Sequence, residues 1–238
     1  MIRLATAVAL APRPRAAAPA IAAPTGYQQP SADLVKIVDA PLTPSVSVGP
    51  DGKTMLLMDR WALPTIEEVA QPETKLAGLS INPKTHGPSR QTFVKGLTFQ
   101  ALPSGPARPV TGLPANARLS QLAWSPDGQH LAFSLTREHA TELWVAEVAT
   151  AKARRVGTLK LNAVLGRPFA WMPDGKTLFV RAVPADLGPA PDSQAAGGPV
   201  IQEALGKKAP NRTYANLLKD AQDEALFDHF LRSRLHMV

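Results

Sequence analysis

The sequence predicts an all-β fold, an incomplete β-propeller of about three four-stranded blades with one helical insertion near the C-terminus. The first observation behind this prediction is a Pro-Asp-Gly turn that occurs three times between short alternating apolar segments. The second is a composition of 24 Pro and 16 Gly with no short repeat, which favours many turns over long helices. With 238 residues, the chain is long enough to bury a sizeable core.

The three turn segments share one order of residues and lie at 46–58, 122–133 and 169–180. In each of them apolar residues alternate before and after x-Pro-Asp-Gly, which is typical of strands with one buried face. Pro fixes φ at the first corner of the turn, and the Asp side chain can accept a hydrogen bond from the backbone beyond it. Gly then takes the left-handed conformation that closes the hairpin. The sequence therefore predicts three β-hairpins.

The spacing of the turns indicates propeller blades. Pro173 follows Pro126 by 47 residues (173 − 126), within the roughly 40–50 residues of a four-stranded blade. The middle blade can be followed through four expected strands, which are Leu119–Trp124, His130–Leu135, Glu142–Val148 and Ala153–Val156.

The first blade is expected to contain an insertion. Pro126 follows Pro50 by 76 residues (126 − 50), which is more than one blade needs. We expect the later strands of this blade at Lys75–Ile81 and Leu97–Leu102, and the insertion at Asn82–Ser89.

The third blade is expected to stay unfinished. Its hairpin ends at Val183, and residues 184–210 are rich in Pro, Gly and Ala, as in a long surface loop. Apolar residues at helical spacing then predict a helix from Tyr214 to about Arg232, with Thr213 as its N-cap. Loop and helix together form a predicted insertion over residues 184–232, after which residues 234–238 suit the start of a third strand.

Residues 1–24 are predicted to be a signal peptide or a disordered leader, and residues 25–238 the partial propeller domain. Arg3 gives a positive start, Leu4–Ala11 is a short apolar run, and Ala20–Ala22 resembles a signal-peptidase site, although Pro12–Arg15 interrupts the pattern. A working signal would make the protein periplasmic or secreted. The sequence holds no apolar stretch of the roughly 18 residues that a membrane span needs.

The formal charge of +7 does not by itself indicate a nucleic-acid partner. Three arginines lie in the leader, and the basic residues between Lys152 and Arg167 have no aromatic residues among them for base stacking. We therefore interpret the second cluster as a solvated strand face and expect no nucleic-acid partner.

Two parts of the chain resemble a known family. Leu122–Gly128 followed by Glu142–Val148 resembles the propeller of the prolyl oligopeptidase family of serine peptidases. A second block resembles the glutamyl endopeptidase branch of that family. Its matching segments are Gly198–Glu203, Gly206–Pro210, Arg212–Tyr214, Asn216–Lys219 and Asp223–Phe227. The resemblance covers roughly Tyr27 to Leu235.

This resemblance implies a two-domain enzyme in which an N-terminal propeller precedes an α/β-hydrolase domain with catalytic Ser, Asp and His. The propeller of such an enzyme restricts access to the active site and favours peptides or unfolded segments. The present sequence lacks the nucleophile elbow Gly-x-Ser-x-Gly, and its nearest match, Gly78–Asn82 around Ser80, has no second Gly. We therefore expect a propeller fragment of an exported serine endopeptidase, inactive without its hydrolase domain. The alternative is a non-catalytic periplasmic module that binds peptides or proteins.

No catalytic, cofactor-binding or metal-binding residue is assigned from the sequence. Cysteine is absent, and the histidines lack metal-ligand spacing. His130 and His139 are expected to face solvent, as is the acidic helix face. That face consists of Asp223, Glu224 and Asp228. The tryptophans that precede two of the turns, Trp124 and Trp171, are expected to pack between blades, as is Trp144.

Overall fold

A computed structural model describes residues 29–61, 63–191, 206 and 216–238 of the chain. The chain divides into two compact units, Met1–Ala40 and Pro41–Val238. Within its described residues the first unit contains one short helix, α1 (Ala32–Val38), with no buried side chain. The second unit contains all the strands, and every feature discussed below lies in it.

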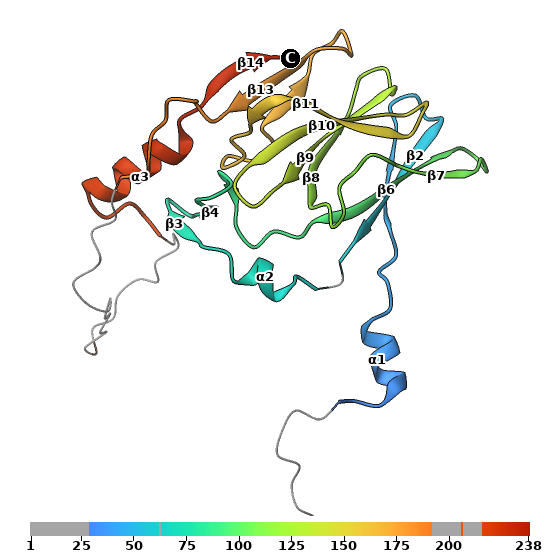
Figure 1. The fold of residues 1–238 in the computed structure, drawn as a ribbon, viewed down its shortest axis with the longest axis horizontal. Coiled ribbons are helices and arrows are strands. Elements are labelled where there is room, and N and C mark those ends of the chain that lie inside the picture. Colours follow the sequence, from blue (N-terminus) through green and yellow to red (C-terminus); the bar gives the residue numbers. More distant parts are fainter. Residues whose placement is uncertain (1–28, 62, 192–205, 207–215) are drawn as a thin grey trace, which may run out of the picture. The chain divides into compact units, whose positions relative to one another are not determined.

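The blade strands of the second unit form three antiparallel sets (Figure 1). Set A consists of β1 (Ser45–Val48), β2 (Thr54–Arg60), β6 (Val94–Ala101) and β7 (Ala107–Pro109). Set B consists of β8 (Leu119–Trp124), β9 (His130–Thr136), β10 (Thr141–Glu147) and β11 (Lys152–Lys160). Set C consists of β12 (Phe169–Trp171), β13 (Leu178–Ala182) and β14 (Arg234–Met237).

The arrangement confirms the predicted fold class, an all-β chain whose sheets do not close into a ring. Sets A and B meet through the register pair Val94 and Leu119. Set B has the four consecutive antiparallel strands expected of the middle blade. The count of about three blades, with the last unfinished, stays a prediction.

All three Pro-Asp-Gly hairpins are confirmed. Their glycines, Gly52, Gly128 and Gly175, have φ values of +66°, +70° and +68°, in the left-handed region that favours glycine. Each glycine N–H donates to the carbonyl three residues earlier, over 2.9–3.0 Å. Each turn aspartate accepts from the N–H two residues further on, over 2.9–3.0 Å. The same two hydrogen bonds therefore form in all three turns.

The first insertion differs from its prediction. It lies between β2 and β6 and contains α2 (Ile66–Val69) and a sheet of β3 (Thr74–Leu76), β4 (Leu79–Asn82) and β5 (Gly87–Pro88). The prediction of a single blade strand at Lys75–Ile81 was wrong, because Ala77 and Gly78 both have positive φ and fold the segment into the β3–β4 hairpin. The predicted strand at Leu97–Leu102 overlaps β6, which pairs with β2.

The second insertion lies between β13 and β14 and contains helix α3 (Ala221–Leu231). The helix begins later than predicted because Asp220 has extended backbone and its carboxylate accepts a 2.8 Å hydrogen bond from the N–H of Asp223. The predicted N-cap, Thr213, lies outside the described residues. β14 pairs antiparallel with β13, which confirms the strand expected at the end of the sequence.

Hydrophobic clusters join these parts. Set A packs on set B through a cluster that includes Leu56, Phe99 and Phe133, and set B packs on set C through a second cluster that includes Leu143 and Val180. A third cluster joins the two insertions. Full burial of one such side chain is worth about 1.5–3 kcal/mol, so stacking of the sets contributes substantially to stability. In the described residues, none of the helices combines the length and the apolar character needed to cross a membrane.

The tryptophans of successive hairpins bridge the strand sets. Trp124 in set B donates its indole N–H to Ser47 in set A, and Trp171 in set C donates to the carbonyl of Ala123 in set B, each over 3.0 Å. Trp144 is buried in the cluster between sets A and B. The predicted packing role of these three residues is confirmed.

Candidate functional site

A pocket among the described residues has a volume of about 450 Å³, in the range of sites that hold small molecules. It lies where the first insertion meets the segment that leads into β8. Its lining combines aromatic and polar side chains, namely Trp61, Pro64, Thr65, Glu67, Glu68, Gln91, Thr92, Phe93, Asn116 and Arg118.

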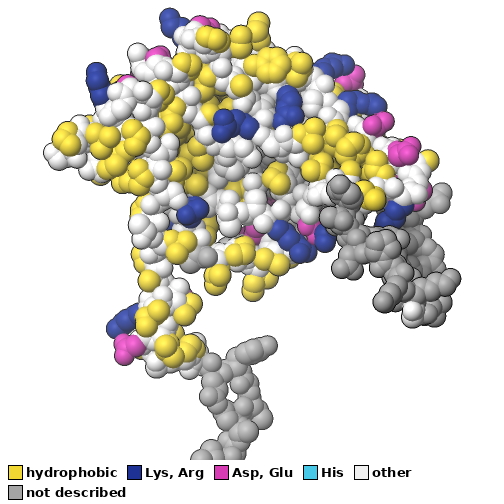
Figure 2. Space-filling view, turned by 180° about the vertical axis from the view of Figure 1, so that it is seen from behind, with side chains coloured by type: hydrophobic (Ala, Val, Ile, Leu, Met, Phe, Trp, Pro, Cys, Tyr) yellow, Lys and Arg dark blue, Asp and Glu magenta, His cyan; other side chains and the backbone are white. Residues whose placement is uncertain are grey.

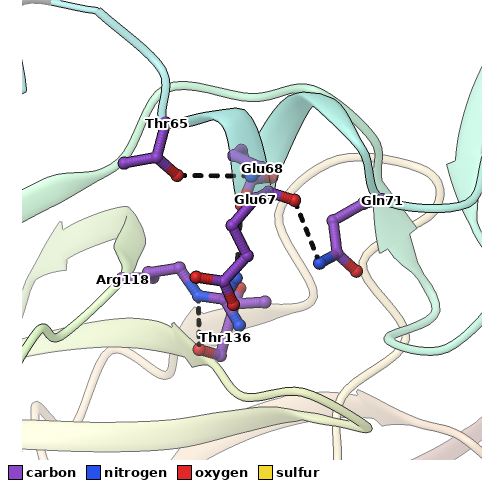
Figure 3. Close-up of polar contacts among 6 residues, drawn as sticks. All are labelled: Thr65, Glu67, Glu68, Gln71, Arg118 and Thr136. Carbon is purple, nitrogen blue, oxygen red and sulfur yellow. Dashed lines mark hydrogen bonds and ion pairs between the residues drawn. The ribbon is translucent and has the colours of Figure 1, made fainter.

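An ion pair between Glu68 and Arg118 forms part of the pocket wall (Figure 3). Thr65 is the N-cap of α2, and its hydroxyl accepts a 3.2 Å hydrogen bond from the N–H of Glu68. This cap fixes the first turn of the helix, so that Glu68 Oε2 lies 3.2 Å from Arg118 Nη1. Arg118 also donates from Nε to the carbonyl of Thr136 over 3.4 Å, which holds the guanidinium against set B.

Burial controls the ionisation of this carboxyl group. Burial raises the pKa of Glu68, and the positive charge and hydrogen bond of Arg118 lower it in part. The cost of desolvating the carboxylate therefore exceeds the attraction of its partner. Keeping Glu68 charged therefore costs free energy in the folded protein. Buried charges of this kind are common in functional sites and also occur in structural ion pairs.

Two aromatic residues of the pocket lie under cations, of which Arg118 lines the pocket and Lys95 does not. The Arg118 guanidinium lies over Phe93, 5.8 Å from the ring centroid, and the Lys95 ammonium lies over Trp61, 4.8 Å from its centroid. Trp61 keeps 43% of its surface exposed. The lining thus combines aromatic surface with two acidic side chains, Glu67 and Glu68, and one basic side chain, Arg118. Apolar surface with a few polar groups is typical of ligand sites.

Ser80 and His139 are exposed, whereas His130 is partly buried. Ser80 is exposed on β4, and His139 is exposed with Nε2 3.3 Å from Glu138 Oε1, as expected. The expectation for His130 was wrong. Its ring is half-buried, 6.1 Å from the centroid of Trp171, and its Nδ1 is buried without a hydrogen-bond partner among the described residues. His130 begins the second strand of its hairpin, where the stacked neighbouring set covers it.

The acidic helix face is largely solvated. Glu224 and Asp228 are exposed, as expected. Asp223 is half-buried, and its Oδ2 accepts a 3.0 Å hydrogen bond from the N–H of Lys219. Asp223 and Glu224 lie in the first turn of α3 and therefore stabilise its start.

Two further clusters of side chains lie outside this pocket. His86 of the first insertion and His229 of α3 lie with ring centroids 6.0 Å apart. The carboxylate of Glu142 accepts from Trp144 Nε1 over 2.9 Å and pairs with Arg137 and Arg155. Only the contact of His86 with His229 joins segments that are distant in the sequence. The partners of Glu142 lie on or next to the neighbouring strands β9, β10 and β11. Among the described residues, no group of three or more His, Cys, Asp or Glu side chains could hold a metal ion.

Comparison with known proteins gives two curated relatives at similar distance. The chain is 35% identical over 225 residues to a protein of Arabidopsis thaliana named "Probable glutamyl endopeptidase, chloroplastic", with 89% of this chain and 23% of the relative covered. It is 34% identical over 225 residues to a protein of the same name from Oryza sativa subsp. japonica, with 88% and 24% covered. The chain thus spans about a quarter of the length of these relatives. No family model matches the chain.

Among solved structures, the β-propeller domain of the Trilobed protease from Pyrococcus furiosus matches 59% of this chain and 35% of that chain, at 15% identity and a TM-score of 0.35. Because this TM-score is below 0.5, the fold assignment rests on the strand pairing of the chain itself. The similarity to known proteins rests on the two sequence relatives. Over most of its length the chain is similar to the glutamyl endopeptidase branch of the prolyl oligopeptidase family, as residues 198–230 predicted.

Proposed function

We propose that this chain is the N-terminal propeller part of a serine-type endopeptidase, and that it restricts the access of peptides to an active site outside its own residues. The observation that carries the proposal is the 35% identity over 225 residues to a segment that makes up 23% of a glutamyl endopeptidase relative. In this proposal a hydrolase domain supplies the catalytic groups, and peptides or unfolded segments are the substrates.

The outer faces of the strand sets support this proposal. Val46 and Val48 of β1 are exposed, and so are Phe179 of β13 and Leu235 and Met237 of β14. Figure 2 shows hydrophobic side chains at the surface in several separate patches, with Lys and Arg between them. In a propeller, such sheet faces are covered by the next blade. We therefore propose that further blades stack on sets A and C.

The domain boundaries and the location belong to the same proposal. Residues 25–238 form the propeller part, with residues 184–232 as its insertion, and residues 1–24 act as an export signal that leads to a periplasmic or secreted protein. The two curated relatives are named chloroplastic, so their location does not support export of this chain. N-terminal sequencing of the mature protein from its cell tests the signal, and a mature chain that begins at Met1 would exclude it.

A labelling experiment tests the absence of catalysis by the chain itself. The purified 238-residue chain is incubated with a serine-directed fluorophosphonate probe and with a fluorogenic peptide substrate, beside a purified serine endopeptidase as positive control. We expect neither labelling nor turnover of the chain. Stoichiometric labelling of a serine in the chain would overturn the proposal.

A second candidate function is peptide binding without any associated catalysis, and the open pocket beside Arg118 favours it. Isothermal titration with a reduced and alkylated unfolded protein tests it. Binding that is lost in Trp61→Ala and kept in Trp144→Phe would support a binding role at this pocket. Absence of binding, or equal binding by both variants, would exclude it.

A further inference from the structure

The two insertions meet each other across one end of set B (Figure 1). Leu76 and Ile81 of the first insertion are buried against Phe230 of α3, and Leu226 and Leu231 pack on the same cluster. The contact ties a segment inserted in set A to a segment inserted in set C.

Hydrogen bonds attach this joint to set B. Thr141 at the start of β10 donates its hydroxyl to the carbonyl of Thr85 over 3.1 Å. The N–H of Ala163, shortly after β11, donates to the carbonyl of His86 over 2.7 Å. The first insertion therefore lies over set B in a fixed position and presents His86 to α3.

Two histidines form the centre of the contact. The His86 ring lies 6.0 Å from that of His229 and 5.6 Å from that of Phe230, and the His229 and Phe230 rings meet edge to face at 5.2 Å. Nδ1 of His86 is buried with no hydrogen-bond partner in the structure. We refer to His86, His229 and Phe230 as the histidine interlock.

The charges that act on the histidine interlock are positive. Lys160 at the end of β11 and His229 act on His86, and Arg232 after α3 acts on His229. Asp228, the carboxylate next to His229 in the sequence, is exposed. Burial, together with His229 and Lys160, lowers the pKa of His86 to about 4, although a hydrogen bond with the Phe230 backbone raises it in part. Burial with Arg232 lowers the pKa of His229. Both rings are therefore neutral at pH 7.

We propose that the histidine interlock is a pH-dependent latch: neutral rings hold α3 against the sheet of β3–β5, and protonation of His86 and His229 releases it. A protonated ring would lie in an apolar contact, next to a second imidazole and to cations. Within the part of the chain that the structure describes, no carboxylate balances that charge, and only the hydrogen bond between His86 and the Phe230 backbone favours it. The latch would let acid loosen the joint between sets A and C while the sheets stay folded. This proposal does not depend on the peptidase assignment.

The direction and size of the effect follow from proton linkage. A lowered histidine pKa in the closed state makes closing favourable above the ordinary pKa of 6.5, and this contribution is lost as the pH falls towards about 4. If the open state restores the ordinary value for His86, the opening equilibrium rises by at most about 20-fold between pH 7 and pH 5. His229 acts in the same direction.

Amide hydrogen exchange of the full chain, corrected for intrinsic exchange rates, tests the latch. We expect amides of β4 and α3 to lose up to about 20-fold of their protection between pH 7 and pH 5, while amides of β9 keep theirs. Equal losses in β9 would mean general unfolding and would overturn the proposal. Unchanged protection in α3 would overturn it as well.

Three variants separate titration from packing. His86→Asn keeps a side chain that tolerates the left-handed backbone at this position, where φ is +49°, and His229→Gln suits a helix. We expect each of these two variants to reduce the pH dependence of amide protection in α3. The control variant His139→Gln, at an exposed site, should leave that pH dependence unchanged. A pH dependence equal to wild type in both variants would contradict the latch. Complete loss of α3 protection at both pH values in both variants would also contradict it, because the rings would then act through packing alone.

Discussion

The indole Nε1–H of Trp124 donates a 3.0 Å hydrogen bond to Ser47 Oγ, and this contact joins the second hairpin to the first. Trp171 makes the equivalent bond from the third hairpin, to the carbonyl of Ala123. Ser47 and Ala123 both stand three residues before the Pro of their turns. The repeat in the sequence is therefore also a repeat of the contact between neighbouring strand sets.

The first prediction concerns this bond. Trp124→Phe keeps an aromatic ring in the cluster but removes the N–H donor, and we expect it to lower the free energy of unfolding by about 0.5–1.5 kcal/mol beyond the effect of the smaller ring. Urea denaturation of wild type, Trp124→Phe, Ser47→Ala and the double variant measures the coupling. If the two single effects add without any coupling energy, the bond does not stabilise the stack. Trp61→Phe, at an exposed site, is the control for general effects of the substitution.

The second prediction compares two glycines at the same place in their turns. Gly52 and Gly175 both have positive φ, so replacement by Ala strains the backbone at either by about 1 kcal/mol. A Cβ at Gly175 would lie 3.1 Å from Asp127 Oδ2, whereas one at Gly52 has no heavy atom within 4 Å. We expect Gly175→Ala to lower the melting temperature more than Gly52→Ala. Equal shifts in melting temperature would indicate that Asp127 does not restrict the space at Gly175.

The third prediction concerns the Glu68–Arg118 pair. Arg118→Met leaves a buried carboxylate without its partner, and we expect the free energy of unfolding at pH 7 to fall by about 1–3 kcal/mol. Glu68→Gln removes the charge that burial disfavours, so we expect a change of less than about 1 kcal/mol. Denaturation of the two variants and of their combination provides the measurement. A larger loss from Glu68→Gln than from Arg118→Met would contradict this account.

The pH dependence of that pair has a defined sign. Because the folded pKa of Glu68 is raised above 4.5, protonation of this group favours the folded state. Its contribution is complete below pH 4.5 and is lost as the pH rises through the raised folded pKa. As the pH rises through this range, the free energy of unfolding of wild type should therefore fall relative to that of the Glu68→Gln variant. A difference between the two proteins that stays constant with pH would exclude the raised pKa.

The fourth prediction concerns Asn162, a buried residue that fixes the end of α3. Its Nδ2 donates to the carbonyls of Phe230 and Arg232 over 2.8 and 3.0 Å, and its Oδ1 accepts from the N–H of Val164 over 3.2 Å. Asn162→Asp replaces the donor with a carboxylate oxygen that faces two carbonyls. We expect it to lower α3 protection in hydrogen exchange more than Asn162→Ala does. The opposite order would show that the amide does not hold the helix.

Local chemistry explains which parts of this fold could be predicted. The hairpins at Pro50, Pro126 and Pro173 were predictable because Pro, Asp and Gly determine their own turn. The prediction of one strand at Lys75–Ile81 was wrong because a turn at Ala77–Gly78 divides the segment into two strands. The apolar alternation around this turn suits a single strand equally well. A turn without Pro-Asp-Gly has a much weaker signal.

The candidate site depended on contacts between distant segments. Glu68 and Arg118 belong to an insertion and to the segment before β8, and His86 and His229 belong to two different insertions. No residue spacing along the chain predicts such pairs. The burial of His130 was missed for the same reason, since a neighbouring strand set covers it.

The central claim is that this chain works as the propeller part of a serine endopeptidase. Its most direct test is native immunoisolation of the chain from its own cells after treatment with a fluorophosphonate probe, followed by mass spectrometry. The account predicts a labelled serine hydrolase domain in the same polypeptide or the same complex, with no label on residues 25–238. Recovery of the chain without any labelled partner, while other serine hydrolases in the same extract are labelled, would contradict it.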